Sequence, residues 1–462
     1  MMMRKLLALL IFATSVANAQ YTIKGTMTPP EKSDFLMLHK LEGVKPKFIG
    51  HTTIKYDTVN VNGEKQALGR FTIQLPKNAA PGAYRATYRN QGSGFIDFLF
   101  NKENIEFIFN PKFPDQSVVF TSSRENKLYA DYLQAYAKKQ NKLDQYLLEY
   151  IKNPNKDTKK AYKKDLKSLK ELQDGFETKS EGMLVHHFIK ASQRYNPSSL
   201  FESVEEFSEF TIENFFRFVE FDSKQLYNSS FIIDKVNDYI FYLNTAEDPE
   251  AQKEIYKESI KTVLSKVSKG KLKKDLVHFL ITSFTDKRDG EMVDWLFAEY
   301  YEDLPSEDQD EEFKKEKLQI LNATVGRVAP DFSWKEGETD YQLSSLNDGD
   351  NYLLVFWSTS CPHCVKDVPE LHSFMQSHKN ISVISFGIEN ESDKDAWVSF
   401  TTNKLPNWHN AIGTHPEHKW SNETVQKYNL LGTPSYFVLD KDKKIIAMPD
   451  QFEDVKKYFE SH

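Results

Sequence analysis

The pattern of hydrophobic and polar positions changes twice along the chain. Over residues 20–123, short runs of aromatic and β-branched residues are separated by turn signals such as Pro81-Gly82. The runs Phe95–Phe100 and Ile105–Phe109 are typical of short strands. Regularly spaced short strands of this kind predict an all-β, sandwich-like module.

Residues 124–320 instead carry apolar positions at helical spacing, as at Leu128, Tyr132 and Tyr136, and contain few glycines and prolines. This pattern predicts an all-α domain. Its last part, residues 302–317, is strongly charged, and we expect a linker and a lead-in helix there. No stretch of this domain carries a recognisable catalytic motif.

Residues 321–462 combine apolar runs with helical segments, which is typical of an α/β fold. The run 352–357 fits a buried strand, and residues 362–378 fit a helix that follows a short turn. The pattern further predicts strands over 381–388, 435–439 and 444–447, and helices over 393–403, 420–429 and 452–459. The fold class predicted for the chain is therefore multidomain, with an N-terminal all-β, a central all-α and a C-terminal α/β domain.

Residues 1–19 have the pattern of a signal peptide. Arg4 and Lys5 precede an apolar run over 6–16, and a small-residue Ala-Asn-Ala cleavage site follows at 17–19. The apolar run is well short of the ~20 residues that span a bilayer. No cysteine follows the cleavage site, so lipid anchoring there is excluded. We expect an exported, periplasmic-type protein with no transmembrane segment in its mature chain.

Composition narrows the possible functions. The hydrophobic content of 39% supports packed cores, and the formal net charge is −7 with no basic stripe, so no nucleic-acid partner is expected. The chain has two cysteines, Cys361 and Cys364. An exported protein of this length with one cysteine pair does not rely on disulfides for stability, so the pair is expected to serve chemistry.

The spacing of these cysteines indicates a redox site. They open the predicted helix, and Pro362 suits its first position. Two thiols separated by two residues can close as a disulfide, which thiol–disulfide exchange requires. The positive end of the helix would stabilise Cys361 as a thiolate, and a protonated His363 would add to this.

The sequence is less consistent with other types of site. A zinc site needs four ligands, and the chain has no second CxxC or CxxH. A structural disulfide across two residues removes little unfolded-state entropy. His409, His415 and His418 have no carboxylate or cysteine at ligand spacing, so we expect a loop histidine at a substrate-binding edge there, and no metal.

Several separated motifs resemble one family. They are the GRVAPDF sequence at 326–332, Phe356-Trp357 before the cysteines, Pro369 in the helix, and Gly432-Thr433-Pro434 followed by SYFVLD. Together they resemble the TlpA/ResA-like branch of thioredoxin-fold, extracytoplasmic thiol–disulfide oxidoreductases over residues 326–462. The resemblance implies a thioredoxin-like domain at 321–462, with an additional hairpin over 331–346.

The resemblance also implies roles for individual residues. Cys361 would attack a substrate disulfide and the more buried Cys364 would resolve the mixed disulfide. Asp367, at the position of a family glutamate, would handle the proton of Cys364, or would be an ordinary acid on the helix surface. The other implied sites are Pro362 and His363 for redox tuning, and Trp357, Thr433 and a cis Pro434 for substrate binding.

Departures from the family leave the direction of electron flow open. Val355 replaces the buried aspartate of thioredoxin, and the CPHC tetrapeptide is that of the oxidant DsbA. The surrounding sequence is TlpA-like and favours a reductase. The reduction potentials of a reductase such as thioredoxin and an oxidant such as DsbA differ by about 150 mV, or roughly 7 kcal/mol. One tetrapeptide does not decide between them.

The leading prediction is an exported oxidoreductase of protein thiols and disulfides with a role in cell redox homeostasis. Its redox group would be the Cys361–Cys364 disulfide with no other cofactor, and it would need an external, membrane-bound electron-transfer partner. Residues 20–123 and 215–301 resemble uncharacterised modules, the first a docking module or a spacer. A scaffold built on these modules is one alternative. A thiol peroxidase is another, although Leu354 replaces the proline of the peroxidase motif.

Overall fold

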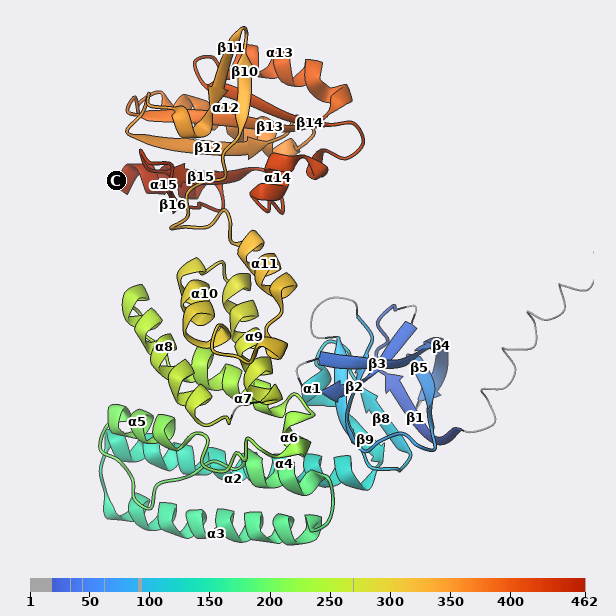
Figure 1. Ribbon diagram of the computed structural model, residues 1–462. Coiled ribbons are helices and arrows are strands. Elements are labelled where there is room, and N and C mark those ends of the chain that lie inside the picture. The colour runs from blue at the N-terminus through green and yellow to red at the C-terminus, as the bar shows by residue number, and fades with distance from the viewer. Residues whose placement is uncertain are drawn as a thin grey trace, which may run out of the picture. The chain divides into compact units, whose positions relative to one another are not determined.

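The computed structural model describes residues 19–33, 35–43, 45–61, 63–89, 94–268 and 270–461, and gives the backbone but no side-chain environment at 19, 20, 45 and 61. The predicted signal peptide therefore lies outside the described residues except for Ala19. Figure 1 shows the labelled elements of the chain. Two compact units are distinguished, one ending at Leu276 and one beginning at Val277. The predicted domains at 20–123, 124–320 and 321–462 follow a different division and stay predictions.

The first part of the chain is rich in strands, as predicted. Its elements are β1 (Ala19–Met27), β2 (Phe35–Glu42), β3 (Lys45–Thr53), β4 (Lys55–Val61), β5 (Glu64–Pro76), β6 (Gly82–Thr87), β7 (Phe95–Phe100), β8 (Ile105–Phe109), α1 (Pro114–Ser117) and β9 (Val119–Ser122). Within the described residues, one sheet has the order β4-β5-β1-β8-β9 and a second has the order β3-β2-β6-β7. Ile23 and Phe107 of the first sheet and Leu38 and Phe98 of the second share one core, as in a sandwich.

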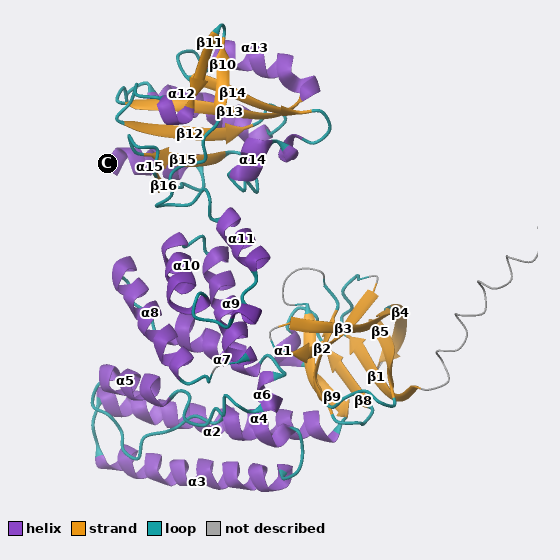
Figure 2. Cartoon of the chain, in the orientation of Figure 1, coloured by secondary structure: helices purple, strands orange, loops and turns teal. Residues whose placement is uncertain are grey.

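Helices follow over the middle of the chain, which confirms the predicted all-α region (Figure 2). They are α2 (Arg124–Lys152), α3 (Lys156–Ser180), α4 (Val185–Ser192), α5 (Val204–Asn214), α6 (Lys224–Tyr227), α7 (Phe231–Asn237), η1 (Asp238–Leu243), α8 (Pro249–Ser265), α9 (Lys271–Asp286), α10 (Gly290–Leu296), η2 (Phe297–Tyr301), η3 (Ser306–Asp308) and α11 (Glu311–Ile320). The hydroxyl of Ser123 accepts from the backbone N–H of Asn126 and caps α2. The Tyr132 hydroxyl donates to Gln173 Oε1 at 2.8 Å and joins α2 to α3.

The rest of the chain forms a mixed α/β domain. Its elements are β10 (Ser333–Glu336), β11 (Thr339–Gln342), η4 (Leu343–Ser345), β12 (Asn351–Trp357), α12 (Pro362–Met375), β13 (Ile381–Asn390), η5 (Glu391–Asp393), α13 (Lys394–Lys404), β14 (His409–His415), η6 (Lys419–Ser421), α14 (Glu423–Lys427), β15 (Ser435–Leu439), β16 (Ile445–Ala447) and α15 (Phe452–Ser461). The sheet order is β14-β13-β12-β15-β16, with β12 parallel to β13 and antiparallel to β15. β10 and β11 form the predicted hairpin.

Alternate side chains of β12 enter two separate cores, which explains the continuous apolar run in its sequence. Leu354 and Phe356 lie in one core, on the face that also contacts Tyr428. Val355 and Trp357 lie in the other core, together with Cys364 of α12. The central strand therefore fixes the start of α12 against one face of the sheet.

Two predictions for this domain were wrong. The segment His409–His415, predicted as a loop, is the strand β14 and pairs in parallel with β13 from Ile384 onward. The single helix predicted over 420–429 is instead a short 3₁₀ helix, η6, followed by the separate helix α14. The side chain of Asn422 caps the backbone N–H groups of Thr424 and Val425, so a new helix begins there.

No helix in the described part of the chain is long and apolar enough to cross a membrane.

Candidate active site

Cys361 and Cys364 are joined by a disulfide at the start of α12. Their Cα atoms are 5.2 Å apart, and Pro362 occupies the first turn of the helix. Cys361 is the N-cap residue, and its Sγ accepts from the backbone N–H of Cys364 at 3.2 Å. A short loop, residues 358–360, joins this cap to the end of β12.

The two sulfurs have different surroundings. Cys361 is partly exposed, whereas Cys364 is 0% exposed and packs in the core that contains Val355 and Val368. A sulfur atom of another protein can therefore reach Cys361 but not Cys364. This asymmetry matches the attacking and resolving roles that the family resemblance implies.

The loop before β15 reaches the same site. The Thr433–Pro434 peptide bond is cis, as predicted, and the carbonyl oxygen of Thr433 lies 3.4 Å from Cys361 Sγ. Leu431, two residues earlier, is 85% exposed. An exposed leucine carries no signal in the sequence, so its position beside this loop was not predicted.

The other predicted site residues are placed in different environments. His363 is exposed, and Asp367 lies half-buried one turn beyond Cys364. Burial and, to a lesser extent, the charge of Asp367 raise the pKa of Tyr436. Trp357 is 0% exposed, and its Nε1 donates to Ser385 Oγ at 2.7 Å. Its predicted part in substrate binding is not supported, because its ring faces the core.

A buried acid was missed by the sequence reasoning. Glu389 lies near the end of β13 and is 0% exposed. Its carboxylate accepts from the backbone N–H of Thr359 at 2.5 Å and from Ser358 Oγ at 3.1 Å. Burial raises the pKa of Glu389, and its hydrogen bonds and the Lys419 charge oppose that rise. The sequence signal that could have identified Glu389 is an acidic residue near the end of an otherwise apolar strand, the strand that follows the CPHC helix.

Lys419, at the start of η6, was also missed. Its Nζ donates to Ser358 Oγ at 2.8 Å and to Ser360 Oγ at 2.5 Å. The lysine and Glu389 therefore both bind the loop that leads into Cys361.

The three histidines do not form a common cluster. His409 Nε2 lies 2.8 Å from Asp348 Oδ2, and its Nδ1 lies 3.3 Å from Glu336 Oε1, so it binds carboxylates that are distant in sequence. His415 Nδ1 accepts from the backbone N–H of His418 in a local turn. His409 thus links β14 to Glu336 of the β10–β11 hairpin, and a histidine at a substrate-binding edge stays a prediction. Among the described residues, no group of three or more His, Cys, Asp or Glu side chains could hold a metal ion.

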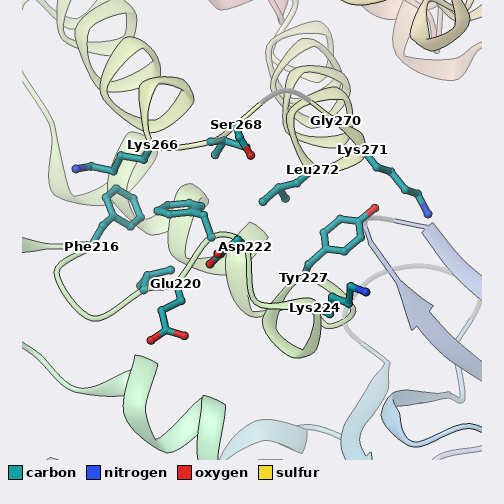
Figure 3. Close-up of a pocket in the computed structure, with 13 residues that line it drawn as sticks. Phe216, Glu220, Asp222, Lys224, Tyr227, Lys266, Ser268, Gly270, Lys271 and Leu272 are labelled. Atoms are coloured by element: carbon teal, nitrogen blue, oxygen red, sulfur yellow. The ribbon is translucent and has the colours of Figure 1, made fainter.

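The first unit contains a cavity of about 930 Å³ (Figure 3). Its walls come from residues 216–222, from α6, and from the segment between α8 and α9. Phe216 and Tyr227 line it together with Lys224, Lys266 and Lys271. None of the predicted site residues lies there.

Comparison with known proteins agrees with the geometry of the C-terminal domain. The model of the Redoxin family matches residues 324–459. Residues 324–459 form a Redoxin domain. The match does not extend over the strand-rich and helical regions.

One curated relative matches part of the chain. It is sporulation thiol-disulfide oxidoreductase A of Bacillus subtilis, which is 29% identical over 115 residues. The alignment covers 24% of this chain and 63% of that protein, so the chain spans less than two thirds of the relative's length.

Solved structures match part of the chain, with low TM-scores. A thioredoxin-like protein from Bacteroides caccae is 17% identical with a TM-score of 0.30, covering 58% of this chain and 98% of that chain. A domain of a possible thiol-disulfide isomerase from Cytophaga hutchinsonii is 26% identical with a TM-score of 0.25, covering 30% of this chain and 91% of that chain.

Proposed function

We propose that this chain is an exported thiol–disulfide oxidoreductase that acts on protein disulfides through Cys361 and Cys364, mainly as a reductase. The observation that carries the proposal is the disulfide at the start of α12, with one sulfur accessible and the other completely buried. The Redoxin match and the name of the curated relative support the same class of reaction. The TlpA-like sequence around CPHC supports the reducing direction.

The proposed cycle begins with the reduced protein. The Cys361 thiolate attacks one sulfur of a substrate disulfide, the other substrate sulfur leaves as a thiolate, and a mixed disulfide forms. Cys364 then loses its proton and attacks Cys361 Sγ. This step releases the second substrate thiolate and restores the Cys361–Cys364 disulfide. Two electrons pass to the substrate, and an external, membrane-bound electron-transfer partner returns them.

Local structure supports each step of this cycle. The positive N-terminal end of α12 stabilises the Cys361 thiolate, and a protonated His363 adds to that effect. In this proposal Asp367, three residues after Cys364 on α12, takes its proton. The Thr433 carbonyl and the exposed Leu431 offer a backbone acceptor and an apolar contact to a substrate polypeptide beside Cys361. In this proposal the cysteine pair is the redox group, and no other cofactor takes part.

Location and partners complete the proposal. The signal-peptide pattern at 1–19 directs the protein out of the cytoplasm. Disulfides form and persist in the compartments outside it. Both cysteines of the chain belong to this pair, so electrons must come from another protein.

Insulin reduction by purified residues 20–462 tests the reaction. We expect turnover by the wild type, none by Cys361→Ser, and a mixed disulfide trapped by Cys364→Ser that dithiothreitol releases. An active Cys361→Ser variant would overturn the proposal.

Equilibration with glutathione tests the direction. A reduction potential near or below about −270 mV supports a reductase, whereas one near about −120 mV would make the protein an oxidant.

A further inference from the structure

Two charged side chains that the proposed cycle does not use bind the loop before Cys361. Glu389 comes from the end of β13 and Lys419 from the start of η6, so separate elements contact one short segment. The segment is residues 358–360, and the backbone N–H of Cys361 donates to its first carbonyl, that of Ser358, at 3.1 Å. Any shift of this loop is therefore passed to Cys361.

The hydroxyl of Ser358 links the two charges. It donates to Glu389 Oε2 at 3.1 Å and accepts from Lys419 Nζ at 2.8 Å. Ser358 and Glu389 are both 0% exposed, and Lys419 is partly buried. Charges in such surroundings are screened by salt much less than charges on an open surface.

The two charges have opposite effects on the neighbouring thiol. The Lys419 ammonium binds Ser360, the residue directly before Cys361, and a positive charge there favours the thiolate. The Glu389 carboxylate, bound to Ser358 and Thr359, disfavours it. Other ionisable groups also face this region: His363, Lys366 and Asp367 lie on α12, and Tyr436 of β15 packs in the core that holds Cys364.

We infer that Glu389 and Lys419 are positioning residues that form an opposed charge pair and set the stability of the Cys361 thiolate. The inference rests on the proposed function and deepens it. Reduction of the disulfide takes two electrons and one proton when Cys361 stays ionised and Cys364 is protonated. A more stable Cys361 thiolate therefore favours the reduced form and makes the reduction potential less negative.

Single-charge variants test the sign of each effect. Lys419→Met should raise the thiol pKa of Cys361 by about 0.5 unit and Glu389→Gln should lower it by a similar amount. The equilibrium constant between the Cys361–Cys364 disulfide and glutathione should change about threefold in each variant, which corresponds to about 15 mV in reduction potential. The two variants should shift it in opposite directions. The pKa is measured from the pH dependence of iodoacetamide alkylation of the reduced full-length protein.

Matched controls separate charge from structure. Lys335→Met and Glu423→Gln make the same charge changes at exposed positions outside this network, and both should leave the potential unchanged. Lys419→Arg keeps the charge and should retain the wild-type pKa. The double variant that combines Lys419→Met with Glu389→Gln is expected to lie close to the wild type because the two effects cancel.

The outcomes distinguish the inference from the proposed function. If both variants move the pKa in the same direction, or neither moves it, the network only shapes the loop and the charge inference fails. If Glu389→Gln does not fold, the comparison of Lys419→Met with Lys419→Arg tests the inference. Equal shifts of the Cys361 thiol pKa in these two variants would reject it. A protein with no reversible thiol–disulfide couple would instead reject the proposed function.

Discussion

Two buried tyrosines of the Redoxin domain differ in what their hydroxyl groups contact. The Tyr428 hydroxyl donates to the Pro330 carbonyl at 2.7 Å. The Tyr436 hydroxyl, in the core that holds Cys364, is buried and has no hydrogen-bond partner among the described residues. Burial raises the pKa of both side chains, so both are neutral at ordinary pH. The pair allows a comparison of the same substitution with and without a hydrogen bond.

Tyr436→Phe should stabilise the domain. A buried hydroxyl without a partner costs about 1–3 kcal/mol, and the substitution removes it while keeping the ring. We expect the free energy of unfolding to rise by about 1 kcal/mol after allowance for the small space left. Tyr428→Phe should lower it by about 1 kcal/mol, because a formed hydrogen bond is lost.

Tryptophan fluorescence during urea denaturation measures both changes in the intact protein. All six tryptophans lie beyond Val277, so their emission reports on the second unit alone. A change of 1 kcal/mol corresponds to about 2–4 °C in Tm for a unit of this size. Equal destabilisation by Tyr436→Phe and Tyr428→Phe, with the disulfide intact in both, would show that the Tyr436 hydroxyl is satisfied and would refute the reasoning.

Two further predictions concern acid stability and substrate binding. Burial alone would raise the pKa of Asp348, but its bond to His409 and the charge of that ring hold it below the ordinary value of 3.8. Stability from this shift is present above that value and is lost as the pH falls through the lower folded pKa. In the Asp348→Asn variant, the free energy of unfolding should therefore fall less steeply as the pH is lowered from about 6 to 2, as measured by urea denaturation. An unchanged pH dependence would contradict this. Leu431→Ser should raise the KM for a protein disulfide about fivefold at unchanged kcat, because a contact worth about 1 kcal/mol is lost. The control Val328→Ser changes another exposed residue and should have no effect. A KM of Leu431→Ser equal to that of the wild type would exclude Leu431 from substrate docking.

Local signals were sufficient for the centre of the Redoxin domain. The apolar run of β12 and the proline after Cys361 predict a strand and a helix start from neighbouring residues alone, and the structure has both. β14 was missed because its residues alternate weakly, and its pairing with β13 decides its conformation. Backbone pairing of this kind is a long-range effect that a local pattern does not contain.

The residues around the site were harder to predict. Glu389 and Lys419 meet Ser358 from positions 31 and 61 residues away in sequence, and only the parallel sheet brings them together. The direction of a side chain was a second difficulty. Trp357 belongs to a recognisable motif, yet its place in the strand alternation directs it to the core.

The position of β1 has a consequence for the order in which the chain folds. β1 lies inside its sheet, antiparallel to β5 and parallel to β8, with Ile23 opposite Ile105. A chain that emerges from the ribosome N-terminus first presents β1 long before β8 exists. Until then one row of β1 backbone groups stays open to pairing with other chains. The sandwich therefore completes its centre only after β8 (Ile105–Phe109) has emerged, and a change that delays β8 should increase aggregation before it alters the finished fold.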